Sequence, residues 1–206
     1  MTDQPDAVGD GGQPHAGPDR RVRADARRSI DTLLRSAMVV FATSGVDAPV
    51  REIAQKAGVG VGTVYRHFPQ RADLVAAVFR HEVDACADAA PALAAQHAPG
   101  EALARWIQRY VDFIAAKRGL AAALHSGDPA FDVLPAYFQG RLQPALQALL
   151  AAAAAAGEVR ADVEPEELLR AVASLSTPDR DGGTDRARRM VALLIDGLRY
   201  GAGPAP

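Results

Sequence analysis

Residues 49–75 read PVREIAQKAGVGVGTVYRHFPQRADLV, and this stretch decides the fold. Its first half places apolar residues on one face of a helix that can open at the initial proline: Ile53, Ala54 and Ala57. Gly58 can take the left-handed conformation that commonly ends a helix, and Gly60 can cap the next helix. We therefore predict a helix-turn-helix whose second helix covers about 61–68.

The second helix of this motif presents polar side chains outward. Val64 and Phe68, four residues apart, face inward. The side chains left to project from a short, positively charged face are Thr63, Tyr65, Arg66 and His67. Such a face suits the major groove of DNA, and the small residues at the helix start allow close approach to a phosphate or base edge. The alternative is a pair of helices used only for core packing or protein contact.

The motif resembles the DNA-binding signature of TetR-type transcriptional regulators. The residues that carry the resemblance are Ile53, Ala54, Ala57, Gly58, Val59, Gly62, Thr63, Val64, Tyr65, Arg66, His67, Phe68 and Leu74. The resemblance implies an all-α protein, in which a three-helix DNA-binding head is joined by a long helix to an α-helical ligand-binding and dimerisation domain. The sequence departs from the family pattern at Gly60, where a serine N-cap is common.

Roles in DNA binding follow from the same resemblance. Arg51 matches a position that reaches a base edge, where a guanidinium can hold guanine with two hydrogen bonds. The start of the recognition helix faces the bases, and later positions contact phosphate. Arg27 and Arg28, which we expect in the first turn of the helix predicted at 25–44, are further candidates for phosphate contact. The candidate DNA-binding residues are Arg27, Arg28, Arg51, Val61, Gly62, Thr63, Tyr65, Arg66, His67 and Arg71.

Composition and charge agree with a helical, DNA-binding protein. Of the 206 residues 49% are hydrophobic, mainly Ala and Leu, and 5% are aromatic, which favours closely packed helices. The net charge of −2 hides an asymmetry, because residues 20–80 carry eleven basic and five acidic groups. Basic charge is therefore concentrated around the helix-turn-helix, as expected of a part that meets a polyanion, although a solvated basic face without a partner is the alternative.

The sequence also bears on location. Cys86 is the only cysteine, so no disulfide can form within the chain. The first residues lack the basic and apolar regions of a secretory signal. The longest nearly apolar run, around 145–156, is well short of the roughly 20 residues that span a bilayer. We expect a cytoplasmic protein with no membrane partner.

Three regions are predicted along the chain. Residues 1–22 are expected to form a disordered arm, residues 23–75 the helix-turn-helix DNA-binding domain, and residues 76–206 the ligand-binding and dimerisation domain. The boundary near residue 75 should fall inside one continuous helix. The helices expected outside the motif cover 25–44, 71–90, 101–116, a short segment to 125, a segment to 157 that Pro144 should kink or divide, 165–176 and 184–200.

The C-terminal part, residues 76–206, contains several aromatic residues and resembles the SbtR-like subgroup. In TetR-type regulators this domain usually holds a pocket whose ligand moves the connecting helix and so the two heads. By that resemblance the candidate ligand-binding residues are Trp106, Tyr110, Phe113, His125, Phe131, Tyr137 and Phe138. Aromatic residues at helical spacing are also ordinary core residues, so the sequence leaves pocket and core open.

The last two expected helices carry more large aliphatic side chains than one buried face requires. In TetR-like regulators the last two helices of each subunit form a four-helix dimer interface, and this segment is similar. The candidate interface residues are Leu168, Leu169, Val172, Leu175, Met190, Val191, Leu194, Ile195 and Leu198. A fully intramolecular helical core is the alternative.

These observations predict a ligand-responsive transcriptional regulator, in our interpretation a repressor, that binds a palindromic operator as a homodimer. Its expected partners are double-stranded DNA, a second copy of the chain and an unknown small-molecule effector. We expect no enzyme activity, no cofactor and no metal site. His81, Glu82, Asp84 and Cys86 do not share one helical face, and the residue types of a hydrolase triad occur only as sequence neighbours around His125.

Two other interpretations remain open. The chain could be a constitutive DNA-binding dimer whose second domain only dimerises. It could also be a small all-α enzyme or a ligand-sequestering protein that has kept the head without using it.

Overall fold

The computed structural model describes residues 18–176 and 184–200, with side chains from residue 27 onward. Within these ranges every regular element is a helix, which confirms the predicted all-α class. None of the helices in the described ranges has both the length and the apolar character needed to cross a bilayer. Of the predicted arm, residues 1–17 lie outside the described residues, and so does the loop expected at 178–183.

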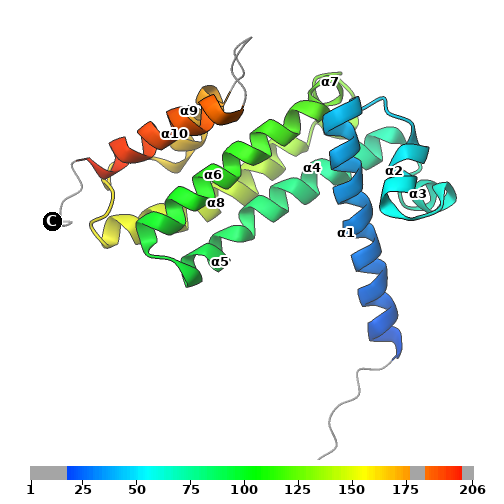
Figure 1. Cartoon of the computed structure of the whole chain (residues 1–206), viewed down its shortest axis with the longest axis horizontal. Helices are drawn as coiled ribbons and strands as arrows, with labels where there is room; N and C mark the ends of the chain where they lie inside the picture. Colours follow the sequence, from blue (N-terminus) through cyan, green and yellow to red (C-terminus); the bar gives the residue numbers. More distant parts are fainter. Residues whose placement is uncertain (1–17, 177–183, 201–206) are drawn as a thin grey trace, which may run out of the picture.

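Three helices form a head at one end of the molecule (Figure 1): α1 (Pro18–Ser44), α2 (Val50–Ala57) and α3 (Val61–His67). Gly58 has the left-handed conformation, with φ 68° and ψ 29°, and Gly60 is extended at the start of α3, so the predicted turn is confirmed. Helix α2 packs against α1, and α3 packs against α2, so that Ile53 and Val64 are both almost fully buried. The short helices are therefore held by burial rather than by their own length.

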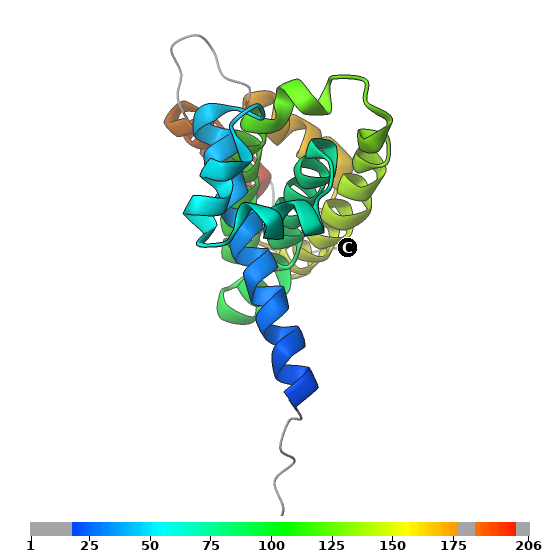
Figure 2. The ribbon, with the colours of Figure 1, turned by 90° about the vertical axis from the view of Figure 1, so that its right-hand side faces the viewer.

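The first helix is longer than the sequence predicted. It begins at Pro18, a residue favoured at the first helical position, and not near Asp25. Residues 18–22 are accordingly helical, so the expected disordered arm cannot extend to residue 22. Arg27 and Arg28 lie well beyond the first turn of α1, which corrects their predicted position. The N-terminal part of α1 extends away from the rest of the molecule (Figure 2).

Helix α4 (Arg71–Ala87) leaves the head and continues into the second part of the molecule. It starts with a capping box that the sequence did not reveal: the backbone N–H of Gln70 donates to Asp73 at 3.0 Å. The helix ends at Ala87, and Pro91 lies in the first turn of the next helix, α5 (Ala89–Gln96). The predicted single helix to residue 90 is thus wrong, because a proline is tolerated in a first turn, where backbone N–H groups lack helical partners.

The second part is a bundle in which α6 packs against α4, α8 and α10. Its remaining elements are α6 (Pro99–Lys117), η1 (Arg118–Leu120), α7 (Ala121–Leu124), η2 (Pro129–Phe131), α8 (Leu134–Ala155), α9 (Pro165–Leu175) and α10 (Thr184–Arg199). Helix α8 runs through Pro144 without a break, so this proline does not divide the helix. Pro144 is exposed while Leu142 and Leu146 beside it are buried, and their packing keeps α8 continuous.

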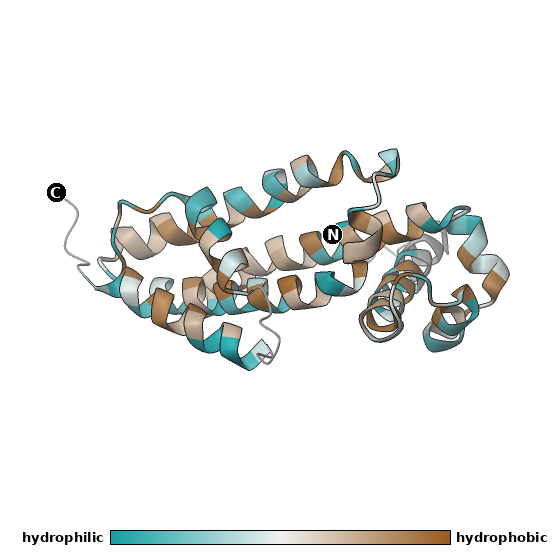
Figure 3. Cartoon of the chain, turned by 90° about the horizontal axis from the view of Figure 1, so that it is seen from above, coloured by the Kyte–Doolittle hydropathy of each residue, from teal (hydrophilic) through white to brown (hydrophobic). Residues whose placement is uncertain are grey.

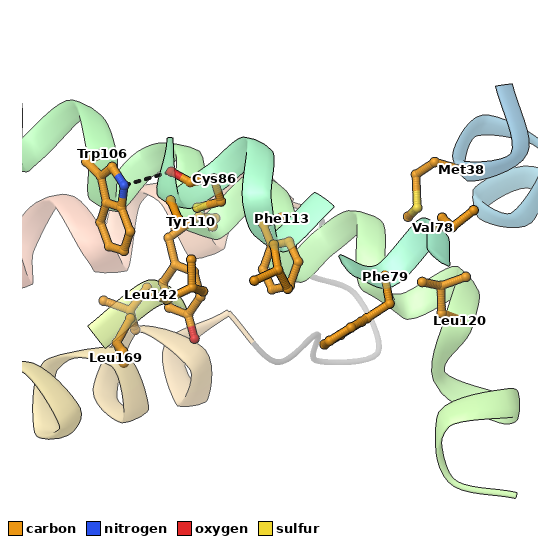
Figure 4. Close-up of a cluster of buried hydrophobic side chains, with 14 of the residues drawn as sticks. Met38, Val78, Phe79, Cys86, Trp106, Tyr110, Phe113, Leu120, Leu142 and Leu169 are labelled. Atoms are coloured by element: carbon orange, nitrogen blue, oxygen red, sulfur yellow. Dashed lines mark hydrogen bonds between the residues drawn. The ribbon is translucent and has the colours of Figure 1, made fainter. Parts of the chain in front are cut away.

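The interior is apolar, and most helices carry hydrophobic and hydrophilic segments next to each other, as amphipathic helices do (Figure 3). Trp106 is fully buried on α6, and its indole N–H donates to the backbone oxygen of Cys86 on α4 at 2.9 Å (Figure 4). This bond satisfies the one polar group of the indole and fixes α6 against α4.

A second contact joins the bundle directly to the head. Gly119 in η1 lies so close to the end of α1 that an added Cβ would be 2.5 Å from the carbonyl oxygen of Phe41. Leu120 is buried next to it, at the same end of the core as Met38 of α1 and Val78 of α4 (Figure 4). The end of α6 therefore rests on α1 through η1, backbone against backbone.

We predict that Gly119→Ala lowers the free energy of unfolding by about 1–3 kcal/mol, because a methyl group has no space against the backbone of α1. Gly140→Ala is the matched control. Gly140 lies inside α8 with open space where a methyl group would project, so alanine there should raise stability by about 0.5–1 kcal/mol. Denaturant unfolding followed by circular dichroism measures both values. Equal stability of the two variants would contradict the close contact.

Candidate DNA-binding surface and ligand-binding domain

The recognition helix α3 exposes the polar row that the sequence predicted. Val64 is 1% exposed and Phe68 packs partly against the core, whereas Tyr65 is 52% exposed. Arg66 and His67 are also exposed, and Thr63 is half-buried. The inward face of α3 thus fixes the helix on the head, and the opposite face is free to meet another molecule.

The start of α3 is not covered by side chains. Gly60 precedes the helix and offers no side-chain cap, and a Cβ added to Gly62 would have no heavy atom within 4 Å. Val61 is exposed at the same end. Backbone and small side chains can therefore approach a groove closely here, although they offer few hydrogen bonds to base edges.

Three candidate arginines outside α3 are exposed. Arg51 lies in the first turn of α2, and Arg27 and Arg28 lie on α1. Arg28 also takes part in an interaction within the chain. All three guanidinium groups belong to the head, which agrees with the basic charge of residues 20–80.

Arg71 is placed differently from the phosphate-contacting role that we expected. Its guanidinium turns into the head, donates to the backbone oxygens of Val46 and Ala48, and lies 5.1 Å from the centre of the Phe41 ring. Its Nε is buried without a hydrogen-bond partner. Burial lowers the pKa of Arg71, while nearby Asp47 and Tyr65 raise it. The side chain ties α4 to the turn between α1 and α2, and we leave it out of the proposed DNA surface.

Four of the predicted ligand-binding aromatics form one cluster inside the bundle. Trp106 stacks with Tyr110 at a ring distance of 5.9 Å, and Tyr110 stacks with Phe113 at 6.0 Å. Phe138 of α8 lies 6.2 Å from Tyr110 and 5.9 Å from Phe113. Trp106, Tyr110 and Phe113 are buried and follow one another along α6 (Figure 4). Most of the cluster is core packing, with Phe138 at its partly exposed edge.

The other three predicted ligand-binding residues take no part in the ring contacts of this cluster. The hydroxyl of Tyr137 donates to Asp84 on α4 at 2.7 Å, and Arg141 donates to the same carboxylate. Burial and the bond to Asp84 raise the pKa of Tyr137. His125 is exposed after α7, and Phe131 is buried in η2. Tyr137 thus takes part in a polar link between α4 and α8.

A cleft of about 230 Å³ opens beside Phe138, and part of its lining was not predicted from the sequence. It lies between α6, α8 and α9. Its polar lining includes Lys117, Gln139 and Gln143, which no aromatic or motif pattern in the sequence singles out. Tyr110 and Phe138 supply the aromatic part of the wall. Tyr110 and Phe138 therefore take part in the packing of the core and also line this cleft.

No group of three or more His, Cys, Asp and Glu side chains that could hold a metal ion occurs in the described ranges. Asp84 is occupied by Tyr137 and Arg141. Burial raises the pKa of Cys86 to about 12, so its thiol stays protonated at neutral pH.

The predicted interface residues of α9 and α10 divide into two groups. Six are buried within the chain: Leu168, Leu169, Val172, Val191, Ile195 and Leu198. Leu175 is exposed, and Met190 and Leu194 are half-buried. Leu193 of α10, which is not one of these candidates, is 64% exposed. Between α9 and α10 a largely apolar groove of about 430 Å³ includes Ala171, Leu193, Leu194 and Gly197.

A helix-turn-helix head with an outward recognition helix, attached by α4 to a separate helical bundle, defines a two-part regulator fold. Residues 33–78 match the family model described as bacterial regulatory proteins, tetR family. Residues 98–200 match the model of the C-terminal domain of SbtR-like transcriptional regulators. The chain belongs to the TetR family of transcriptional regulators, with a C-terminal domain of the SbtR-like type.

Solved structures agree with this assignment. A TetR transcriptional regulator from Streptomyces coelicolor is 40% identical, with a TM-score of 0.71 over 84% of this chain and 99% of that chain. A TetR transcription regulatory protein from Mycobacterium vanbaalenii is 38% identical, with a TM-score of 0.68 over 87% of this chain and 99% of that one. A gamma-butyrolactone receptor at 22% identity and TM-score 0.58, covering 86% and 91% of the two chains, shares the fold. Curated proteins gave no match.

Two arginine variants separate support of the head from DNA contact. Arg71→Ala should lower the free energy of unfolding by about 1–3 kcal/mol, because the backbone oxygens of Val46 and Ala48 lose a charged donor. Arg66→Ala, on the exposed face of α3, should stay within about 0.5 kcal/mol of the parent protein. Thermal and urea unfolding measure both. Unchanged stability of Arg71→Ala together with weaker DNA binding would show instead that Arg71 contacts DNA.

Proposed function

We propose that the protein is a ligand-responsive repressor that binds a palindromic operator as a homodimer. The observation that carries the DNA-binding part is the recognition helix, whose buried Val64 fixes a row of exposed groups outward. The family assignment supports the same conclusion, since TetR-family proteins are transcriptional regulators. Two heads related by a two-fold axis would meet half-sites about one helical turn of DNA apart.

The exposed residues suggest how the operator is recognised. Arg51 is the candidate with the strongest means of reading a base, through two hydrogen bonds to guanine. Val61 and Gly62 offer apolar contact and close approach of the backbone, but no side-chain hydrogen bond to a base. The shape of the DNA should therefore carry part of the sequence specificity. Tyr65, Arg66, His67, Arg27 and Arg28 are proposed to contact phosphates, which position the head without reading sequence.

The apolar face of α9 and α10 supports the proposed dimer. Leu193 is exposed in a groove that also contains Ala171 and Gly197, whose small size allows close helix approach, and Leu175 of α9 is exposed as well. Leu169 of α9 and Ile195 of α10 are buried on the sides of these helices that face the bundle. A second copy of the same pair of helices would cover these exposed side chains in a four-helix arrangement.

The junction at Gly119 gives the effector a route to DNA. A ligand held between α6, α8 and α9 would move the end of α6, and η1 rests directly on the backbone of α1. The polar link of Asp84 with Tyr137 and Arg141 joins α8 to α4. Ligand binding would thus favour a separation of the two heads that no longer matches the operator, which is a population shift.

Arg51→Ala should reduce discrimination between operator and random DNA by about 1–3 kcal/mol, because a bidentate base contact is lost. Tyr65→Phe should weaken binding to both DNAs about equally, because a phosphate contact carries no sequence information. Fluorescence anisotropy with an operator selected from genomic fragments measures both. Arg105→Ala, on the exposed side of α6, is the control and should change neither affinity. An equal loss on both DNAs for Arg51→Ala would refute its assignment to a base.

Leu193→Glu should convert the proposed dimer to monomers, since a carboxylate would be desolvated in the interface. The matched control is Val133→Glu, which changes another exposed apolar residue, 57% exposed before α8. Sedimentation velocity at several concentrations gives the assembly state of each. If Leu193→Glu remains a dimer, the interface lies elsewhere.

A further inference from the structure

Lys117 has an unusual place for a charged residue of this chain. The sequence holds 23 Lys and Arg residues, of which only Lys56 and Lys117 are lysines. Lys56 is exposed on α2, whereas Lys117 is half-buried at the end of α6. The ammonium lies 5.9 Å from the centre of the Phe138 ring, and it has no carboxylate partner among the described residues. A cation partly removed from water without a counter-charge is unfavourable, and burial lowers the pKa of Lys117.

The surroundings of Lys117 form a small, mixed cleft. Its volume of about 230 Å³ is below the roughly 300–1,000 Å³ typical of pockets for drug-sized molecules. Tyr110, Phe138 and Leu169 give it aromatic and aliphatic walls. Gln139 and Gln143 of α8 add two neutral amides. Besides the ion pair of Glu166 and Arg170, the cleft therefore offers apolar contact, neutral hydrogen-bonding groups and one unpaired positive charge.

The acidic group that lines the cleft is already paired. Glu166 of α9 lines the cleft, but it accepts a hydrogen bond from Arg170 on the same helix at 2.7 Å. These two charges offset each other and leave the charge of Lys117 in excess. A ligand with one negative charge would complete the balance, and a charge-assisted hydrogen bond would compensate the ammonium for lost water.

We propose that this cleft binds a small monocarboxylate with an aromatic or aliphatic body, whose carboxylate pairs with Lys117 and whose body packs between Tyr110, Phe138 and Leu169. A single ammonium with neutral amides suits one negative charge better than the double charge of a phosphate monoester. Binding of the acid at Lys117 is independent of the proposed function. Only the statement that this ligand is the effector rests on the proposed function.

The position of the cleft fits a binding site for an effector. Glu166, Leu169, Arg170 and Ala173 face it from α9, whereas the groove between α9 and α10 is lined by other residues of that helix, including Glu167 and Ala171. A dimer partner over that groove would leave the cleft open. Lys117 also stands two residues before Gly119, so a ligand that draws Lys117 inward acts next to the contact with α1.

Titration calorimetry of the full chain tests the proposal with benzoate, phenylacetate and octanoate, each against its neutral amide. At least one acid should bind, and its amide should bind at least about tenfold more weakly. Lys117→Met should lose about tenfold or more in affinity for that acid, and Lys56→Met should lose none. Lys117→Met should remain folded by circular dichroism, because it removes an unpaired charge. Equal acid binding to Lys117→Met, or no binding of any acid at millimolar concentration, would overturn the proposal.

Chemical labelling tests the same site without a substitution. Acetic anhydride modifies both lysines, and peptide mass spectrometry separates them, so Lys56 serves as the internal reference. The bound acid should slow acetylation of Lys117 relative to Lys56 severalfold, and unchanged relative rates would count against the site. DNA binding is measured separately. If the acid binds at Lys117 but leaves the operator complex intact, the ligand assignment stands and the proposed switch fails.

Discussion

The contact between the backbones at Gly119 and Phe41 sets how the two parts of the molecule sit relative to each other. With no side chain between them, η1 and α1 have little freedom to slide, because packed interiors deform in discrete steps rather than continuously. Leu120, Met38 and Val78 fill the adjoining space, so α4 takes part in the same junction. Any displacement at the end of α6 must either carry α1 with it or open this contact.

The head itself is stable only as a unit. Helix α3 has seven residues, too few to persist alone, and it packs against α2, which in turn packs against α1. Arg71 holds the turn between those helices from α4, so the helix that leaves the head also braces it. The placement of the exposed face of α3 and the attachment of α4 to the head thus depend on the same few residues.

Much of this arrangement could be predicted from sequence, because the signals are local. Gly58 and Gly60 fix the turn of the motif through their own backbone preferences, and the apolar period of α1 identifies its buried face. Features that depend on distant residues could not be predicted. The inward turn of Arg71 depends on carbonyl groups 23 and 25 residues earlier, and the cleft at Lys117 needs three helices to meet. The scarcity of lysine is visible in the sequence, but it does not show that Lys117 lies in a cleft.

The open surroundings of Gly62 allow amino-acid changes at this position during evolution. A side chain at this position would project into open space on the outer face of the recognition helix, and glycine within a helix costs about 0.5–1 kcal/mol relative to alanine. Most replacements are therefore sterically permitted within the protein. In the proposed mode of DNA binding, one codon change here would add a side chain at the start of the recognition helix without a loss of stability to be repaired first.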